Sequence, residues 1–146
     1  MIDANQLRKI LPQAYPFLLI DKVIDFEEGK RLTAIKNITA NEWSVLGDAG
    51  DPGHFPEVLI IEAAAQAALV LYYLSKTDLK KSESERVFPS KITANFIKSG
   101  GVGDELTITV MANKMMDVGG YLDVTVLAAS QKLAEVEIIY SVKRWE

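Results

Sequence analysis

The chain has 146 residues, of which 49% are hydrophobic and 25% charged, a composition typical of one packed globular domain. Its formal net charge of -4 gives no electrostatic reason to bind nucleic acid, and the absence of cysteine excludes disulfides, thiolate metal sites and cysteine nucleophiles. Since the chain contains one histidine, a zinc site would rest almost entirely on carboxylates, so we expect no metal and no cofactor.

Two segments of the sequence indicate where in the cell the protein is expected, namely its first residues and its longest apolar stretch. Residues 1–6 have neither a basic start nor an apolar run, so no secretory signal is expected and a cytoplasmic location follows by default. The longest apolar stretch, residues 58–74, contains Glu62 and Gln66 and is shorter than the roughly 20 residues that a membrane span requires. It therefore predicts a buried helix and not a membrane span.

The N-terminal third predicts a short helix, a hairpin and a loop. Residues 4–11 form an amphipathic segment, which Asp3 can cap through the first-turn N–H groups. Residues 17–26 and 31–38 are rich in β-branched and aromatic residues, and a turn with one glycine joins them, which predicts a hairpin. Residues 41–56 contain three glycines and two prolines and predict a long loop, and long loops in compact domains are often functional.

The remaining two thirds predict one helix and four strands. Residues 57–75 favour a helix with apolar residues on every face, which should be buried all round. Residues 77–86 are polar and dense in charge, which predicts a solvated loop. Strand-like runs follow at residues 90–97, 105–115, 121–129 and 133–143. This order predicts one α+β domain over residues 1–146, with an antiparallel sheet of about six strands wrapped around one long central helix.

Three separated segments resemble the 3-hydroxyacyl-acyl-carrier-protein dehydratases. They are LPQAYPFLLIDKV at residues 11–23, VLIIEAAAQAA at residues 58–68, and ANFIK at residues 94–98 followed by GDEL at residues 103–106. The resemblance implies a hot-dog fold and a homodimer or higher homo-oligomer with active sites at the subunit interface. It also implies a substrate carried on acyl carrier protein, from which water is eliminated to give a trans-2-enoyl thioester in fatty-acid-type biosynthesis.

Dehydration of such a thioester needs a base for the α-proton, an acid for the leaving hydroxyl and a donor for the enolate-like oxygen. Glu62 corresponds to the acidic catalytic residue of the family, and its apolar helix suits a carboxyl group that acts as an acid. Gln66 lies four residues later on the same face, where it can orient Glu62 or a water molecule. The residues expected to bind substrate are Gln66, Gly47, Phe55, Pro56 and Val58.

Two alignments compete for the base, which the family provides from a Gly-His-Phe-Pro motif. The chain contains this motif at residues 53–56, but His54 is only eight positions before Glu62 (62 − 54 = 8), closer than in the family. An alignment without gaps keeps Gly47 as the family glycine and puts Asp48 at the histidine position, and a carboxylate is a weak base. An alignment with gaps leaves His54 as the base, paired with Glu62 of the other subunit.

Two further functions remain as alternatives. A non-catalytic protein that binds acyl thioesters agrees with Asp48 at the histidine position. A hot-dog thioesterase is the second alternative, because one fold hosts both reactions and a carboxylate such as Glu62 can activate water. The Tyr15-Pro16-Phe17 signature argues against the thioesterase.

Overall fold

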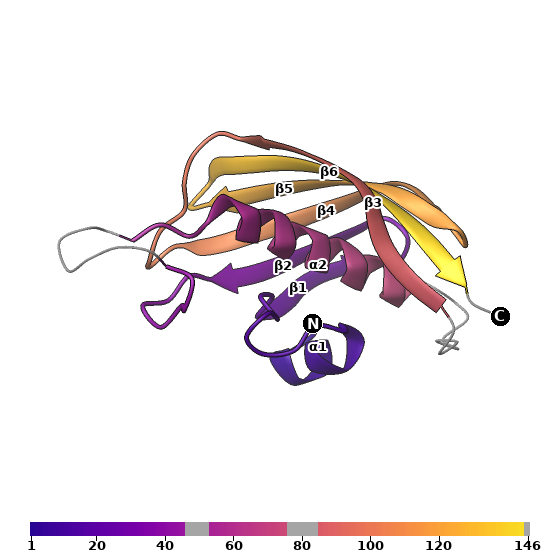
Figure 1. Ribbon diagram of the computed structural model, residues 1–146, viewed down its shortest axis with the longest axis horizontal. Coiled ribbons are helices and arrows are strands. Elements are labelled where there is room, and N and C mark those ends of the chain that lie inside the picture. The colour runs from indigo at the N-terminus through magenta and orange to yellow at the C-terminus, as the bar shows by residue number, and fades with distance from the viewer. Residues whose placement is uncertain (46–52, 76–84, 145–146) are drawn as a thin grey trace.

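The computed structural model describes residues 1–45, 53–75 and 85–144, which form two helices and six strands (Figure 1). In chain order these elements are α1 (Ala4–Ile10), β1 (Lys22–Glu27), β2 (Arg31–Asn37), α2 (Glu57–Ser75), β3 (Glu85–Phe96), β4 (Glu105–Met116), β5 (Gly119–Ala128) and β6 (Gln131–Arg144). The predicted α+β order of one short helix, two strands, one long helix and four strands is confirmed.

The six strands form one antiparallel sheet in the order β1-β2-β4-β5-β6-β3. The sheet curves around α2, which contacts the five strands from β2 to β6 (Figure 1). At the β1 edge, Ile2 forms an isolated bridge with Val23, whereas no described residue pairs with the outer edge of β3. This arrangement confirms the predicted hot-dog fold.

Local interactions explain where α1 and the hairpin begin and end. The Asp3 carboxylate accepts a hydrogen bond from the Gln6 N–H, and the Gln6 side chain accepts one from the Asp3 N–H, which forms a capping box at the start of α1. The turn between β1 and β2 contains Gly29 at a φ of 70°, a conformation that glycine adopts without strain. The predicted cap and hairpin are both present.

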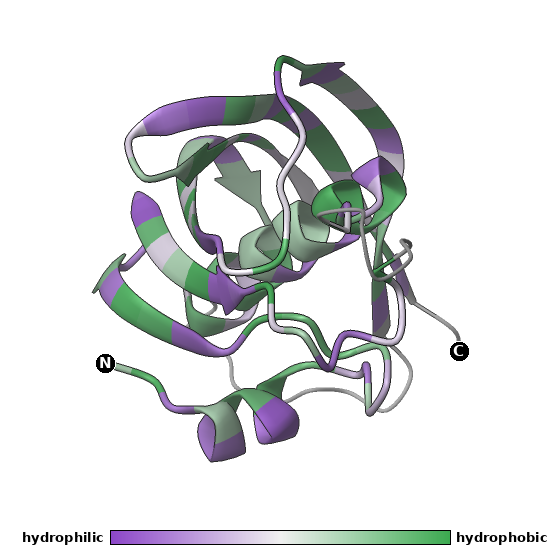
Figure 2. Ribbon diagram, turned by 90° about the vertical axis from the view of Figure 1, so that its left-hand side faces the viewer, coloured by the Kyte–Doolittle hydropathy of each residue, from purple (hydrophilic) through white to green (hydrophobic). Residues whose placement is uncertain are grey.

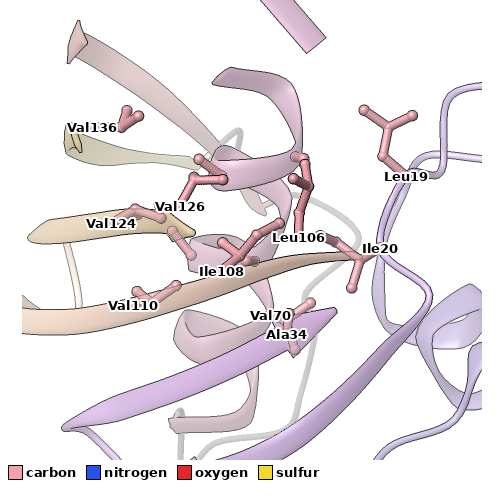
Figure 3. Packing of buried hydrophobic residues seen from close by; sticks show 14 of the residues in the cluster. Leu19, Ile20, Ala34, Val70, Leu106, Ile108, Val110, Val124, Val126 and Val136 are labelled. Carbon is pink, nitrogen blue, oxygen red and sulfur yellow. The ribbon is translucent and has the colours of Figure 1, made fainter. Parts of the chain in front are cut away.

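The core is formed where the apolar face of the sheet packs on α2. Helix α2 provides four fully buried alanines, and small side chains allow strands to approach a helix closely. Hydrophobic residues run along α2 and along alternate positions of the strands (Figure 2). Ile108 and Val110 of β4 and Val124 and Val126 of β5 belong to this cluster (Figure 3). The fully buried alanines are Ala63, Ala64, Ala67 and Ala68.

The structure differs from the sequence-based expectations at two strands. Strand β1 begins at Lys22, not at residue 17, because the backbone of Phe17 and Leu19 bonds to a side chain of α2 instead of to a strand. Strand β3 begins at Glu85, inside the stretch predicted as a loop, because β3 continues to pair with β6 as far as Arg144. A bulge between Pro89 and Lys91 accommodates the proline, which cannot donate a ladder bond.

Helix α2 is also not buried all round within one chain. A stripe at helical spacing stays exposed or half-buried, and it includes Val58, Ile61, Glu62, Ala65 and Tyr73. Among the described residues α2 is the one helix that is long and apolar enough to cross a membrane, but 61% of the relevant stretch is buried in the fold. The helix is therefore the core helix of the domain, with one stripe left uncovered.

Candidate active site

The candidate site is built on α2, where Glu62 of the uncovered stripe and the buried Gln66 lie one turn apart. The Glu62 side chain is half-buried, and Gln66 is fully buried. Gln66 Nε2 donates a hydrogen bond of 3.0 Å to Glu62 Oε1. The i, i+4 spacing predicted that the two side chains would share a face, and the structure brings them into direct contact.

Gln66 also holds the segment that precedes β1. Its Nε2 donates to the Phe17 carbonyl at 2.7 Å, and its Oε1 accepts from the Leu19 N–H at 2.9 Å. On the outer side of this segment, Trp43 Nε1 donates to the Pro16 carbonyl at 3.2 Å, and the Trp43 ring makes an edge contact with Phe17. The segment next to Glu62 is therefore held by Gln66 from inside and by Trp43 from outside.

Tyr140 of β6 lies beneath the same part of α2. Its buried hydroxyl donates a hydrogen bond to the Ala65 carbonyl. Burial raises the pKa of Tyr140 far above its usual value, and the neighbouring acidic groups of Glu62 and Tyr73 act in the same direction. Tyr140 therefore stays neutral and supports the helix as a donor, so it does not compete with Glu62 for a proton.

His54 lies just before α2 and is anchored by its backbone. It forms an isolated bridge with Gly101, and the next residue, Phe55, donates its N–H to the Gly100 carbonyl at 3.0 Å. The His54 side chain is exposed, and none of the hydrogen bonds among the described residues joins it to Glu62. Within one chain the structure thus does not bring the predicted base and acid into contact.

The other predicted site residues occupy different environments. Val58 is 70% exposed in the first turn of α2, Pro56 is half-buried just before it, and the Phe55 ring is buried in the core. Asp48 and Gly47 lie outside the described residues. Val58 and Pro56 therefore flank the start of the helix that carries Glu62, whereas Phe55 faces the protein interior.

Two side chains near the site went unnoticed in the sequence. Lys36 of β2 is buried and contacts both Glu42 and Phe55, and Tyr140 bonds to α2. Neither stands out locally, because a lysine and a tyrosine in strands usually face solvent or core.

Among the described residues, no group of three or more histidine, aspartate or glutamate side chains is arranged to hold a metal ion.

The chain is a hot-dog domain, because a six-stranded antiparallel sheet wraps around one helix. Its candidate site is acidic, since Glu62 lies on the uncovered stripe of that helix. Residues 11–143 match the model of the FabA-like domain. The chain belongs to the FabA-like family.

Two of the similar relatives illustrate the match, and both are named as dehydratases. The chain is 36% identical over 139 residues to a 3-hydroxyacyl-[acyl-carrier-protein] dehydratase FabZ of Clostridium botulinum, covering 95% of this chain and 94% of that protein. It is 44% identical over 117 residues to the enzyme of the same name from Actinobacillus pleuropneumoniae, covering 80% and 75%. Both matches cover most of the chain. The family-model range, residues 11–143, includes Glu62 and the first dehydratase-like segment.

Solved structures support the fold at lower identity. The dehydratase heterocomplex ApeI:P from Xenorhabdus doucetiae superimposes with a TM-score of 0.78 at 16% identity, covering 96% of this chain and 91% of that one. A thioesterase from Haemophilus influenzae has a TM-score of 0.71 at 12% identity, covering 99% and 92%. At these identities the likeness shows a shared fold and does not separate the two activities.

Proposed function

We propose that the chain dehydrates 3-hydroxyacyl thioesters, carried on acyl carrier protein, to trans-2-enoyl thioesters in fatty-acid-type biosynthesis. The observation that carries this proposal is the carboxyl group of Glu62, half-buried on the uncovered stripe of α2 and held by Gln66. The relatives that match most of the chain are named as dehydratases of this kind, whereas the thioesterases among the solved structures are similar only in fold. The expected cytoplasmic location belongs to the same proposal.

In this reaction a base removes the α-proton, the Cα–Cβ double bond forms, and the β-hydroxyl leaves as water after it gains a proton. Gln66 occupies Oε1 of Glu62, and no hydrogen bond among the described residues uses Oε2. Glu62 would therefore give its proton from Oε2 to the leaving hydroxyl. The Leu59 and Ile60 N–H groups already bond to the Pro56 carbonyl. The Val58 N–H, which precedes them in the first turn of α2, would therefore bind the thioester oxygen as its negative charge develops.

The base would come from the segment that precedes α2. His54 is the one histidine in the chain, and its exposed side chain would meet Glu62 of a second copy. In the alignment without gaps, Asp48 holds that position and turnover would be slow, because an aspartate is weakly basic. Around these two groups, Gly47, Phe55, Pro56 and Val58 remain the proposed substrate-binding residues, whereas Gln66 would act by holding Glu62.

Two features support assembly of the chain with a second copy. The outer edge of β3 is unpaired among the described residues and carries partly exposed apolar side chains. The uncovered stripe of α2 also exposes apolar surface beside Glu62. Pairing of two β3 edges would extend the sheet and cover both features, which would also bring His54 of one copy toward Glu62 of the other.

The proposal is tested by following the absorbance of the enoyl thioester formed from a 3-hydroxyacyl-acyl-carrier-protein substrate. Glu62→Gln should abolish turnover and leave the fold intact, since it removes the acidic proton and keeps the shape. Glu57→Gln is the matched control, because Glu57 is an exposed carboxylate at the start of the same helix. Turnover that survives Glu62→Gln would exclude Glu62 as the acid.

The second candidate function is binding of acyl thioesters without conversion. It is favoured by the exposed His54 side chain, which does not contact Glu62 within one chain. In that case, calorimetry should detect binding of a non-hydrolysable acyl-pantetheine, and the dehydration assay should give no product. A wild-type protein that shows neither turnover nor binding would contradict both functions.

A further inference from the structure

Lys36 is the one buried cation among the described residues. It lies on β2, and its side chain is only 6% exposed, although lysine is seldom buried without a partner. Its Nζ lies 2.5 Å from Glu42 Oε1, and the Glu42 side chain is 12% exposed. The same Nζ lies 5.9 Å from the centre of the Phe55 ring, which is within the range of a cation–π contact.

These two contacts come from opposite ends of one segment of the sequence. Glu42 precedes residues 46–52, and Phe55 follows them immediately after His54. A buried ion pair adds little net stability, because its attraction is offset by the loss of hydration of both charges. What a pair of this kind does provide is a fixed position, since removal of either charge leaves the other buried without a partner.

A second anchor for His54 starts at Ile38, the residue that follows the end of β2. Ile38 donates its N–H to the Asp104 carbonyl and accepts from the Gly103 N–H. Asp104 in turn accepts a hydrogen bond from the Gly101 N–H at 2.9 Å, and Gly101 bridges to His54. The end of β2 therefore reaches the His54 backbone through the turn at residues 100–104 and through the Phe55 ring.

Packing at Gly100 leaves little freedom in this arrangement. A Cβ atom on Gly100 would approach Ile38 Cδ1 and Leu133 Cδ1 to 3.2 Å each. The Gly100 carbonyl, which accepts the Phe55 N–H, is thus seated tightly against the core. Phe55 is thus held through its backbone by this hydrogen bond and through its ring by the Lys36 ammonium.

We propose that Lys36 is a positioning residue, which fixes the backbone at His54 and Phe55 by holding Glu42 and the Phe55 ring at once. Its effect on catalysis rests on the proposed dehydratase function, in which the base comes from this segment. Its effect on the backbone does not depend on that function. Loss of the Lys36 charge should loosen the Phe55 N–H bond to Gly100 and, where the enzyme turns over substrate, lower kcat more than it changes KM.

The hydrogen exchange of one amide tests the proposal directly. The protein is labelled with ¹³C at the histidine carbonyl and ¹⁵N at the phenylalanine amide. An NMR spectrum that correlates the two labels then shows one signal, the Phe55 amide, because the chain has one histidine and Phe55 follows it. In Lys36→Met we expect the Phe55 amide to exchange at least tenfold faster than in the wild type, relative to amides of β4 and β5 in the same sample. Lys36→Arg, which keeps the charge, should restore most of the protection.

Two further variants separate positioning from general stability. Lys36→Met with Glu42→Gln removes both charges and keeps the experiment interpretable where the single variant fails to fold. Leu122→Ala in the buried part of β5 loosens the core elsewhere and should change all protected amides together. The proposal is overturned where Phe55 exchange rises only in parallel with the β4 and β5 amides.

Enzyme activity is measured separately from the exchange of the Phe55 amide. With a 3-hydroxyacyl substrate, kcat should fall in the Lys36→Met variants in proportion to the lost Phe55 protection and recover in Lys36→Arg. A wild type without turnover would count against the proposed function, but the exchange of Phe55 would still decide whether Lys36 positions this segment. Lost protection with unchanged kcat in an active enzyme would overturn the catalytic part.

Discussion

Gln66 Nε2 donates a hydrogen bond of 3.0 Å to Glu62 Oε1, one helical turn earlier on α2. The orientation of the Gln66 amide is set by the backbone, because Oε1 accepts from the Leu19 N–H and Nε2 also donates to the Phe17 carbonyl. A reversed amide would put the Gln66 oxygen against two other acceptors and its NH₂ group against a donor. Gln66 therefore presents a donor to Glu62, which bonds at Oε1 and leaves Oε2 for the substrate.

Replacement of Gln66 by methionine should weaken both the site and the fold. Loss of the bond to Glu62 should lower kcat/KM by about 10- to 100-fold, since small displacements of a reacting group have effects of this size. The free energy of unfolding should fall by about 1–3 kcal/mol, because the buried Leu19 N–H and Phe17 carbonyl lose their partner. Enzyme kinetics and urea titration measure the two effects.

Gln131→Met at the exposed first residue of β6 is the control, and both quantities should stay near their wild-type values. An unchanged kcat/KM in Gln66→Met would show that Glu62 needs no support from Gln66. A loss of stability without a loss of kcat/KM would restrict Gln66 to a structural role.

The same pair of residues illustrates how far the sequence could predict the site. The i, i+4 spacing on an apolar helix was enough to place Glu62 and Gln66 together. The contacts of Gln66 with Phe17 and Leu19 join residues 49 and 47 positions apart, and no local pattern indicates them. For that reason residues 17–21 read as strand from their β-branched and aromatic content, although their backbone bonds to α2.

Strand β3 shows the same limit for the fold. Its first residues follow a charged, polar stretch, and local composition favours a loop there, whereas pairing with the distant β6 extends the strand to Glu85. The strand predicted at residues 133–143 is present as part of β6, because its alternation, which buries Val136, Ile138 and Tyr140, depends on period alone. Lys36 could not be recognised, since its two partners become neighbours only in the folded chain.

We predict that the wild-type chain sediments as a dimer at micromolar concentration through its β3 edge. Ile92 is 37% exposed on β3, and Ile92→Lys should raise the dissociation constant by about tenfold or more, equivalent to at least ~1.4 kcal/mol, by bringing like charges together. Ile24→Lys on β1 is the matched control at the other edge, where Ile24 is 43% exposed. A monomeric wild type, or equal effects of both substitutions, would contradict pairing through β3.

Tyr140 should make the fold sensitive to alkaline pH. Its folded-state pKa is raised by burial, with the charge of Glu62 as the next cause, so above about pH 10 the unfolded chain loses this proton while the folded chain keeps it. The unfolded state then binds fewer protons, and the free energy of unfolding falls as pH rises. Urea titrations at about pH 8 and about pH 11 measure the slope.

Tyr140→Phe should cost about 0.5–1.5 kcal/mol at the lower pH, because the bond to the Ala65 carbonyl is lost. It should also reduce the fall in stability between the two pH values. Tyr15→Phe, at an exposed tyrosine, serves as the control and should leave the fall as it is in the wild type. If the wild type and Tyr140→Phe lose equal amounts of stability between the two pH values, another group causes the loss of stability at alkaline pH.

Substitutions at positions 48 and 54 should identify the catalytic base. Where the alignment without gaps holds, the wild type should turn over 3-hydroxyacyl thioesters slowly, and His54→Ala should change the rate little. Asp48→His with Ala49→Phe and Gly50→Pro would then restore the Gly-His-Phe-Pro motif after Gly47. This triple substitution should raise kcat, since a positioned general base typically contributes about 10²- to 10⁴-fold.

Where His54 is the working base, the results reverse. His54→Ala should then lower kcat by about the same 10²- to 10⁴-fold, and the substitutions at residues 48–50 should give no gain. His54→Gln is the matched variant, because it keeps a polar side chain of similar length in the exposed position without a basic ring nitrogen. Rapid wild-type turnover that survives both His54 substitutions would contradict both alignments, since the chain contains no second histidine to accept the α-proton.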